Sequence, residues 1–542
     1  MRRRWFVGAL MVLLLMSISG LAFAHTMLKR SVPEADGILE KAPERIELQF
    51  NEEVEAEFGA IAVYDHTGNR VDKGDAALDP RDVTKVVASL TALRDGLYTV
   101  AYRVVSADGH PVSGSYGFTV GKGIEGARYY KPVMPDPNGP PPTGLLVGYW
   151  LAVGGLLVLM GLGITQGIVA RSEPSRRYGL FLWLAVAGAA IGSILFLIER
   201  TGQAAGVSPL AALNPSLWGR MLLTKAGRVI LYRLVLLLWT AVSMRLVIRR
   251  WWAAALAGTV GLATVALGGH AAALEQPILT VSLDWLHLLS AATWTGGLVQ
   301  FAFLVPMARR GDSSPSAELG IMVRRFSALA AISVAVLIGT GLYPALLHIP
   351  SQKALWQTTY GMALVTKLSL IIPLLLLGAA NLLVVGPRLR RNESASPWLR
   401  RLVYGEVALM AAVLAVAALL TNVPPARFAV PPEVLDLGLH SGNYEITYYM
   451  SPLAPGYRNL EVAVRPHEGA LPGDTKLTLE LVAKTHDMGK NVTDGKNLGD
   501  GRYRFENVLI GMPGPWNFIL EIAPPGAKAD RITWEITVPE VP

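Results

Sequence analysis

Three residues in the first part of the chain have the types and spacing to bind a metal ion. If segment 1–24 is a signal peptide cleaved after A-F-A, the mature chain begins at His25. A terminal histidine offers a metal two nitrogens, one from its free amine and one from its imidazole. Further along, S-A-D-G-H-P-V-S-G places Asp108 two residues before His110, and on a strand both side chains then lie on one face. Imidazole and carboxylate together suit a divalent late transition metal.

The first 24 residues have the three parts of a secretory signal. Three arginines follow Met1, residues 6–16 form an apolar stretch, and A-F-A at residues 22–24 is a small-residue cleavage site. We therefore predict that the chain is exported from His25 onward, which puts the metal site outside the cell.

These same residues resemble the CopC copper-binding family. The resemblance rests on His25 after a signal peptide, on S-V-P-E-A-D-G at residues 31–37 and on S-A-D-G-H-P-V-S-G. It implies a small secreted β-sandwich over residues 25–122, with a Cu(II) site made by the amine and imidazole of His25, the carboxylate of Asp108 and the imidazole of His110. A lone histidine is more often an ordinary surface residue, but three residues in the family pattern favour the site. The family's methionine-rich Cu(I) loop has little counterpart here beyond Met27 and Met134.

The composition is that of a membrane protein with soluble parts attached. Of 542 residues, 52% are hydrophobic and only 17% are charged. The net charge of +8 comes from arginines beside apolar runs, without the basic and aromatic patch that reads single-stranded nucleic acid; we expect no nucleic-acid partner. Cysteine is absent, so any metal must bind His, Met, Asp, Glu or backbone atoms.

The polar parts of the chain flank a long apolar part. Residues 38–120 alternate short apolar and polar runs between turns, which predicts strands. Residues 123–143 are rich in Pro and Gly and predict a semi-rigid linker. Residues 430–542 again read as short strands, which predicts a second external β-sandwich.

Residues 144–421 contain eight apolar stretches near the ~20 residues that a helix needs to cross a bilayer. We therefore predict an eight-helix polytopic membrane domain. Residues 208–228 are too polar to span, and we expect there either an amphipathic segment on the outer surface or a plain loop. The stretches run over approximately 145–170, 179–198, 229–248, 253–274, 285–307, 327–348, 362–385 and 402–420.

Basic loops alternate with less basic loops along these stretches. Arginines gather at residues 171–177, 245–250, 309–325 and 388–401, whereas the connection at residues 275–284 is acidic. Because cytoplasmic loops carry the excess of basic residues, we predict a multi-pass protein of the cell (plasma) membrane with both β domains outside. The signal peptide indicates the same orientation independently.

Two of the histidines in the apolar part lie close together in the sequence. G-G-H-A-A-A places His270 near the outer end of the fourth predicted helix, and D-W-L-H-L-L places Asp284 and His287 at the outer start of the fifth. Ionisable residues at membrane depth are costly unless paired or functional, so we predict His270 and His287 as ligands of a membrane metal site. The alternative is packing, with each histidine bonded to a carbonyl or to Asp284. Weaker candidates at the same level are Glu199, His348 and Met362.

These stretches resemble the CopD copper-resistance membrane family over most of residues 144–420. The resemblance also rests on R-F-S-A-L-A-A-I-S-V-A-V-L-I-G-T-G-L-Y and on Y-G-M-A-L-V-T-K-L-S-L-I-I-P-L-L-L-L-G-A-A-N, which contains Lys367 and Asn381. It implies a polytopic protein that handles copper together with CopC. The roles of Lys367 and Asn381, as packing residues or as part of a polar path, stay open at this point.

The last part of the chain contains K-T-H-D-M-G, with His486 and Met488, and G-M-P-G-P-W, with Met512 and Trp516. It resembles the YtkA-like domain that accompanies some CopD proteins. Imidazole with thioethers suits Cu(I), so His486 and Met488 are candidate ligands. Met and Trp at such spacing are more often core residues, and we favour the core over the ligand interpretation.

The leading hypothesis is a copper transport protein and not an enzyme. It captures Cu(II) outside the cell and passes it to the membrane domain, in the direction of uptake, with copper ions and the lipid bilayer as its partners. No Walker motif and no D-K-T-G sequence indicates an ATPase. One alternative is a haem-containing membrane protein that reduces the delivered copper. Another is an oxidative copper enzyme at His25, which the additional carboxylate of Asp108 disfavours.

Overall fold

The structure is a computed structural model, and the part of the chain that it describes excludes several short segments. The described residues fall into two compact units, one of residues 1–348 with 362–424 and the other of residues 349–361 with 425–542. The described residues are 26, 28–34, 37–106, 109–121, 129–130, 132, 140–171, 176–246, 251–269, 271, 276–307, 315–349, 352–389, 396–426, 435–441, 443–450, 453, 456–467, 469, 471–484, 491–511 and 514–538.

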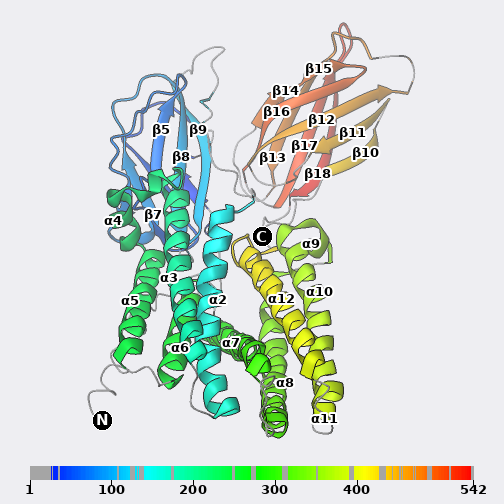
Figure 1. Cartoon of the computed structure of the whole chain (residues 1–542). Helices are drawn as coiled ribbons and strands as arrows, with labels where there is room; N and C mark the ends of the chain where they lie inside the picture. Colours follow the sequence, from blue (N-terminus) through cyan, green and yellow to red (C-terminus); the bar gives the residue numbers. More distant parts are fainter. Residues whose placement is uncertain are drawn as a thin grey trace. The chain divides into compact units, whose positions relative to one another are not determined.

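The first β domain consists of two sheets that share one core (Figure 1). One sheet has the order β1-β3-β7-β6, and the other has the order β2-β9-β8-β4 with β5 also paired to β8. Alternate residues of the strands point inward, as Ile46, Leu48 and Phe50 of β3 do. The strands are β1 (Leu28–Val32), β2 (Ile38–Leu39), β3 (Arg45–Phe50), β4 (Val54–Glu55), β5 (Ile61–Asp65), β6 (Ala77–Asp79), β7 (Asp82–Ser89), β8 (Gly96–Ser106) and β9 (Pro111–Val120).

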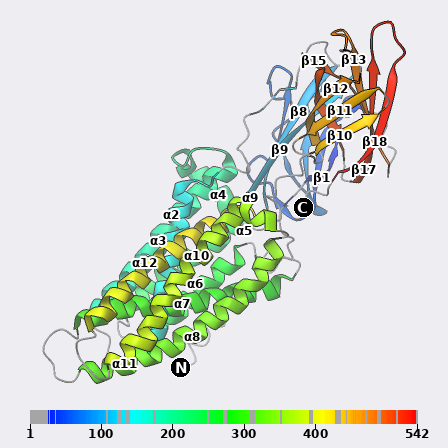
Figure 2. The same ribbon diagram turned by 90° about the vertical axis from the view of Figure 1, so that its right-hand side faces the viewer.

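Long helices follow the β domain and lie over the eight predicted stretches. They run along a common direction in the two views (Figures 1 and 2), and α2 packs against α3, α6, α7 and α12. The long helices are α2 (Thr143–Thr165) with the π-helix η1 (Gln166–Ala170), α3 (Arg176–Ala205), α5 (Lys225–Leu246), α6 (Trp251–Leu267), α7 (Pro277–Met307), α8 (Pro315–His348), α10 (Thr359–Ala380) with the π-helix η4 (Asn381–Val385), and α12 (Ser396–Thr421). Short helices are η2 (Ala211–Leu213), α4 (Pro215–Leu223), α9 (Gln352–Gln357) and α11 (Gly386–Leu389).

Six helices among the described residues are long and apolar enough to cross a membrane. They correspond to α2, α3, α5, α8, α10 and α12. Helix α6 is apolar but shorter, and α7 carries the polar residues Asp284 and His287 in its first half. The helical membrane region is confirmed, whereas the count of eight crossings stays a prediction for α6 and α7.

Small residues allow the central helices to approach closely. A Cβ added at Gly161 of α2 would lie 1.9 Å from the carbonyl oxygen of Ala292, and one at Gly296 of α7 would lie 2.1 Å from the backbone of Gly161. Only glycine fits at such a crossing, as is common between membrane helices. The α2–α7 crossing fixes the height of α7, which carries His287.

One expectation about the helix boundaries needs correction. The connection 275–284 was expected to be a turn, but α7 begins at Pro277 and includes Asp284, because proline is favourable in the first turn of a helix. His287 therefore lies ten residues, about 15 Å, inside the helix and not at its start. Of the two alternatives for segment 208–228, the plain loop is excluded, because the segment contains η2 and α4, with Asn214 capping α4.

The second unit contains a β-rich domain with its own core (Figure 1). Its sheets have the orders β10-β11-β12-β16-β15 and β14-β13-β17-β18, and Tyr448, Phe518 and Trp534 stack within the core. The YtkA-like assignment stays a prediction. The strands are β10 (Leu435–Ser441), β11 (Tyr444–Met450), β12 (Gly456–Pro466), β13 (Lys476–Ala483), β14 (Asn491–Asp494), β15 (Lys496–Gly499), β16 (Arg502–Ile510), β17 (Gly514–Ala523) and β18 (Asp530–Val538).

Candidate metal-binding sites

His110 lies in the tight turn between β8 and β9. The Ser106 hydroxyl donates to the His110 carbonyl at 3.0 Å, and the His110 N–H donates to the Ser106 hydroxyl oxygen at 3.1 Å. Gly109 has φ +83, a conformation that glycine adopts without strain. The turn therefore holds the His110 side chain in place at one end of the domain.

The described residue next to His25 is anchored near this same turn. Thr26 is buried, and its hydroxyl donates to the Glu52 carboxylate at 2.5 Å. Glu52 lies two residues before Val54 of β4, and Val54 pairs with Ser106 of β8. The backbone pairing thus carries position 26 toward the end of the domain that presents His110. His25 and Asp108 themselves lie outside the described residues, so the three-residue Cu(II) site stays a prediction.

Sequence reasoning did not find the side chain that contacts His110. Arg200 of α3 is 7% exposed, and its Nη2 lies 3.0 Å from His110 Nε2 and donates to Asn422 Oδ1 at 3.0 Å. A guanidinium is always protonated and can only donate, so His110 Nε2 is the acceptor. Its lone pair is therefore engaged by Arg200. A metal on Nε2 and this hydrogen bond exclude each other.

The β domain has further contacts with the helices around Arg200. Phe58 packs against a cluster with buried Leu197, Met221 and Ile230. The Glu55 carboxylate of β4 accepts a hydrogen bond from the backbone N–H of Lys225, at the first turn of α5. This N–H has no acceptor within its own helix, so the β domain supplies one.

Burial of Glu55 makes this contact sensitive to pH. Burial raises the pKa of Glu55 from 4.5 to about 7, and the Lys225 N–H and the nearby Arg228 partly offset it. Below pH 4.5 the carboxyl is protonated in both the docked and the released domain. Between about 4.5 and 7 it is ionised only when released, so we predict that docking weakens as the pH rises through this window.

Energy transfer between two dyes will measure this dependence. The chain has no cysteine, so H66C and R220C, at exposed positions, label specifically. We expect the efficiency of energy transfer to fall as the pH rises from 4.5 to 7 in the parent, and to stay constant over this range in E55Q. An equal fall in both proteins would assign the dependence to another group.

His287 projects from α7 toward α8. Its Nδ1 lies 2.9 Å from Thr340 Oγ1, and the Thr340 hydroxyl donates its proton to the Val336 carbonyl at 2.7 Å. Thr340 has no second proton to give, so His287 Nδ1 is the donor in this contact. The imidazole also hydrogen-bonds to the backbone of Leu337. This tautomer leaves the lone pair on Nε2. The ring also lies against Gly341, where an added Cβ would be 3.3 Å from the imidazole.

A series of polar side chains links Arg200, which contacts His110, to His287. Tyr149 of α2 interacts electrostatically with Arg200 and with Asp284. Lys367 of α10 interacts in turn with Asp284 and with His287. We call Arg200, Tyr149, Asp284, Lys367 and His287 the polar line; it extends from the docked β domain into the bundle.

The other predicted ligands are not brought into this arrangement by the described residues. His270, His486 and Met488 lie outside the described part of the chain, as does Met512. Met362 is 53% exposed on α10, and Glu199 is 8% exposed on α3. The side chain of His348 is not described, and Trp516 belongs to the second core. Within the described residues, no three His, Asp or Glu side chains form a metal-sized cluster.

The fold defines a class, the membrane proteins that carry a β domain on a bundle of membrane-capable helices. Comparison with known families specifies the metal. Residues 28–121 match the CopC domain, residues 141–277 the copper resistance protein D-like N-terminal domain, and residues 320–420 copper resistance protein D. The chain belongs to the copper transport and resistance proteins that join a CopC domain to a CopD domain.

Curated relatives match the whole chain and its parts. The copper transport protein CutJ of Bacillus subtilis (strain 168) is 29% identical over 95% of this chain and 96% of its own length. Copper resistance protein C of Escherichia coli is 36% identical over 20% of this chain and 90% of its own length. Copper resistance protein D of Pseudomonas syringae pv. tomato is 29% identical over 46% of this chain and 81% of its own length.

Proposed function

We propose that the CopC domain captures Cu(II) outside the cell and passes it to the CopD bundle for uptake. The observation that supports this most directly is the contact between His110 and Arg200. It joins a predicted copper ligand to the polar line of the bundle. The protein acts as a transporter without catalysing a chemical reaction, and it lies in the plasma membrane with both β domains outside.

Arg200 has a specific role in this proposal. Copper that binds His110 Nε2 displaces the guanidinium of Arg200. When the guanidinium returns to His110, it displaces the copper, which then moves to the neighbouring Tyr149 and Asp284. A buried positive charge at the contact also repels the cation. Arg200 therefore competes with copper for His110 and promotes release into the bundle.

We predict that R200Q strengthens Cu(II) binding and abolishes copper accumulation in cells. A hydrogen bond from a charged donor contributes about 1.5–3 kcal/mol, so its loss should raise the affinity about tenfold or more. Titration of the purified full-length protein and cellular copper content are the two measurements. R220Q, at an exposed arginine of α4, is the control. Unchanged affinity and accumulation in R200Q would exclude the competition.

The direction of transport can be determined from the copper content of cells that lack or overproduce the protein. We expect deletion to lower cellular copper and overexpression to raise it. The opposite pair of results would assign export.

The orientation is tested by reporter fusions. We predict that a reporter enzyme fused after Leu420 is active only if it is a type that folds outside the cytoplasm, because α12 runs outward from the basic segment 388–401. A fusion within residues 390–395 should show the reverse. Activity of a cytoplasmic reporter after Leu420 would contradict the proposed topology.

A further inference from the structure

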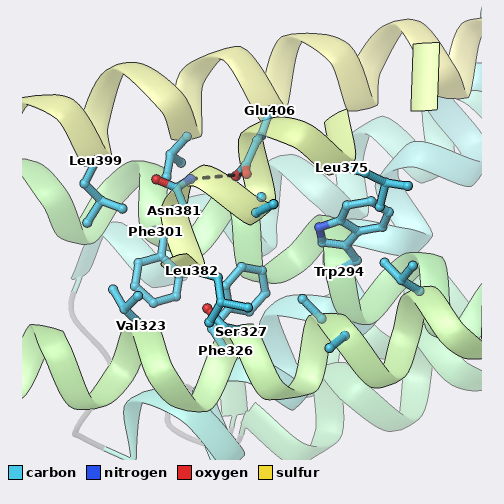
Figure 3. A pocket seen from close by; sticks show the side chains of 16 residues that line it. Trp294, Phe301, Val323, Phe326, Ser327, Leu375, Asn381, Leu382, Leu399 and Glu406 are labelled. Carbon is cyan, nitrogen blue, oxygen red and sulfur yellow. Dashed lines mark hydrogen bonds between the residues drawn. The ribbon is translucent and has the colours of Figure 1, made fainter. Parts of the chain in front are cut away.

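Four helices of the bundle line a partly open cavity of about 270 Å³ (Figure 3). Its lining comes from α7, α8, α12 and α10 with its continuation η4. Most of the lining is apolar or aromatic, including Trp294, Phe301 and Phe326. The polar side chains are Glu406, Asn381 and Ser327. A cavity of this size with polar groups has room for several water molecules.

Glu406 and Asn381 form a buried pair on this cavity. Glu406 is 3% and Asn381 8% exposed, and Asn381 Nδ2 donates to Glu406 Oε1 at 3.2 Å. Asn381 Oδ1 is buried and has no hydrogen-bond partner among the described residues. An unsatisfied buried acceptor is costly, so its presence on a cavity indicates a missing donor.

The backbone at Asn381 is also unusual. The α-helix α10 changes there into the π-helix η4, and the N–H of Gly386 bonds to the Asn381 carbonyl. Single π-helical turns inside helices occur frequently at functional sites. The irregular turn places the Asn381 amide beside Glu406 of α12 (Figure 3).

The lining indicates what the cavity binds. Its described side chains include no imidazole, thioether or thiolate, the ligands that suit copper in soft or intermediate sites. Glu406 is the one titratable side chain among the described lining residues. The other helices contribute uncharged side chains, such as Trp294 and Phe301 of α7 and Ser327 of α8. An ionised carboxylate without a counter-charge is costly at membrane depth, so a proton is the ligand that fits.

The cavity lies directly along the helices that carry the outer polar residues. Trp294 follows His287 by seven residues on α7, Val334 precedes Thr340 by six on α8, and Leu375 follows Lys367 by eight on α10. At 1.5 Å per residue the cavity begins about 9–12 Å deeper than the polar line. The cavity and the polar line thus share α7 and α10, and α8 lines the cavity and also carries Thr340, the partner of His287.

We propose that Glu406 takes up a proton from water in the cavity and releases it again, and that Asn381 pairs with both forms. The amide Nδ2 donates to the ionised carboxylate. After rotation of the amide, Oδ1 accepts from the O–H of the protonated carboxyl. A second part, which rests on the proposed function, is that this proton exchange is coupled to copper movement through α7, α8 and α10.

Infrared spectroscopy of the full-length protein in lipid nanodiscs tests the site without copper. We expect a carboxylic C=O band that disappears as the pH is raised and that is absent in E406Q. The Gln side chain preserves the acceptor for Asn381, so E406Q should fold like the parent. N381L should shift the frequency of the band, because that frequency reports the hydrogen bond. E461Q, outside the membrane helices, should leave the band unchanged. A band that persists in E406Q, or its absence from the parent at every pH, would overturn the proton site.

Proteoliposomes of phosphatidylethanolamine and phosphatidylglycerol test the coupling. We expect an imposed pH gradient to change the copper flux of the parent, and this response to be lost in E406Q and kept in S333A, which removes a hydroxyl bonded to its own helix. Copper flux in E406Q that still responds to the gradient would overturn the coupling. If a sodium gradient changed the copper flux of the parent as much as the pH gradient does, the coupled ion would be a metal cation and not a proton. If the parent moves no copper at all while the infrared band titrates, the proposed transport fails and the proton site stands.

Discussion

Replacing His110 with alanine is expected to remove tight Cu(II) binding from the protein. Position 110 supplies one of the few proposed ligands, and no cysteine is present to substitute for it. Loss of an outer-shell partner alone costs about 10–100-fold in metal affinity, so loss of a direct ligand should cost more than ~100-fold. Titration of the full-length protein with Cu(II), followed by the d–d absorption and the electron paramagnetic resonance spectrum, measures the effect.

Two companion variants separate the ligand from a general loss of structure. H66A removes an exposed histidine of the same domain and should bind Cu(II) like the parent. One glycine added before His25 in the mature chain converts the terminal amine into an amide, which should also weaken binding sharply. If the extended protein bound Cu(II) as tightly as the parent, a site formed by the terminal amine would be wrong.

The second large effect is expected at His287, with His270 as its predicted companion. H287A or H270A should reduce copper accumulation to that of cells lacking the protein, while the Cu(II) affinity of the β domain stays unchanged. The reason is that His287 Nε2 keeps its lone pair while Nδ1 donates to Thr340. Losing one imidazole from a buried site with few ligands removes much of the coordination.

Substitutions near His287 distinguish a ligand from a packing residue. T340V removes the hydroxyl that accepts from His287 Nδ1 and should lower transport by about 10–100-fold, without changing Cu(II) capture. S282A removes an exposed hydroxyl on the same helix and should have no effect. If H287A and H270A moved copper like the parent, the packing interpretation would be correct and the membrane site would lie elsewhere.

Local patterns in the sequence were enough to predict the classes of structure and most element positions. Apolar stretches of about 20 residues coincide with the long helices, and the alternation in R-I-E-L-Q-F coincides with β3. Both patterns are local. A helix in lipid needs a run of apolar residues, and a strand with one face in a core needs apolar residues at alternate positions, so each can be read from neighbouring residues. The motifs around His110 and along residues 144–420 indicated the copper family in the same way.

The start of α7 shows where local patterns failed. The residues between Pro277 and Asp284 include Thr280 and Ser282, so hydropathy alone placed the helix start near residue 285. The Thr280 hydroxyl bonds to the backbone of Ala271 and Gln276, and the helix extends through this polar segment. His287 consequently lies within the bundle, beside Thr340, and not at its outer end.

Sequence alone determined which residue types are present for copper chemistry and which segments are strands or helices. Only the tertiary structure decided their partners: Arg200 for His110, Thr340 for His287, and Asn381 for Glu406. These pairs are separated by 90, 53 and 25 residues, and no periodicity within one segment specifies which side chain of another will face it. That choice depends on close helix crossings such as Gly161 with Gly296 and on the docking of the β domain. The helix crossings and the docking of the β domain both result from the packing of whole helices and sheets.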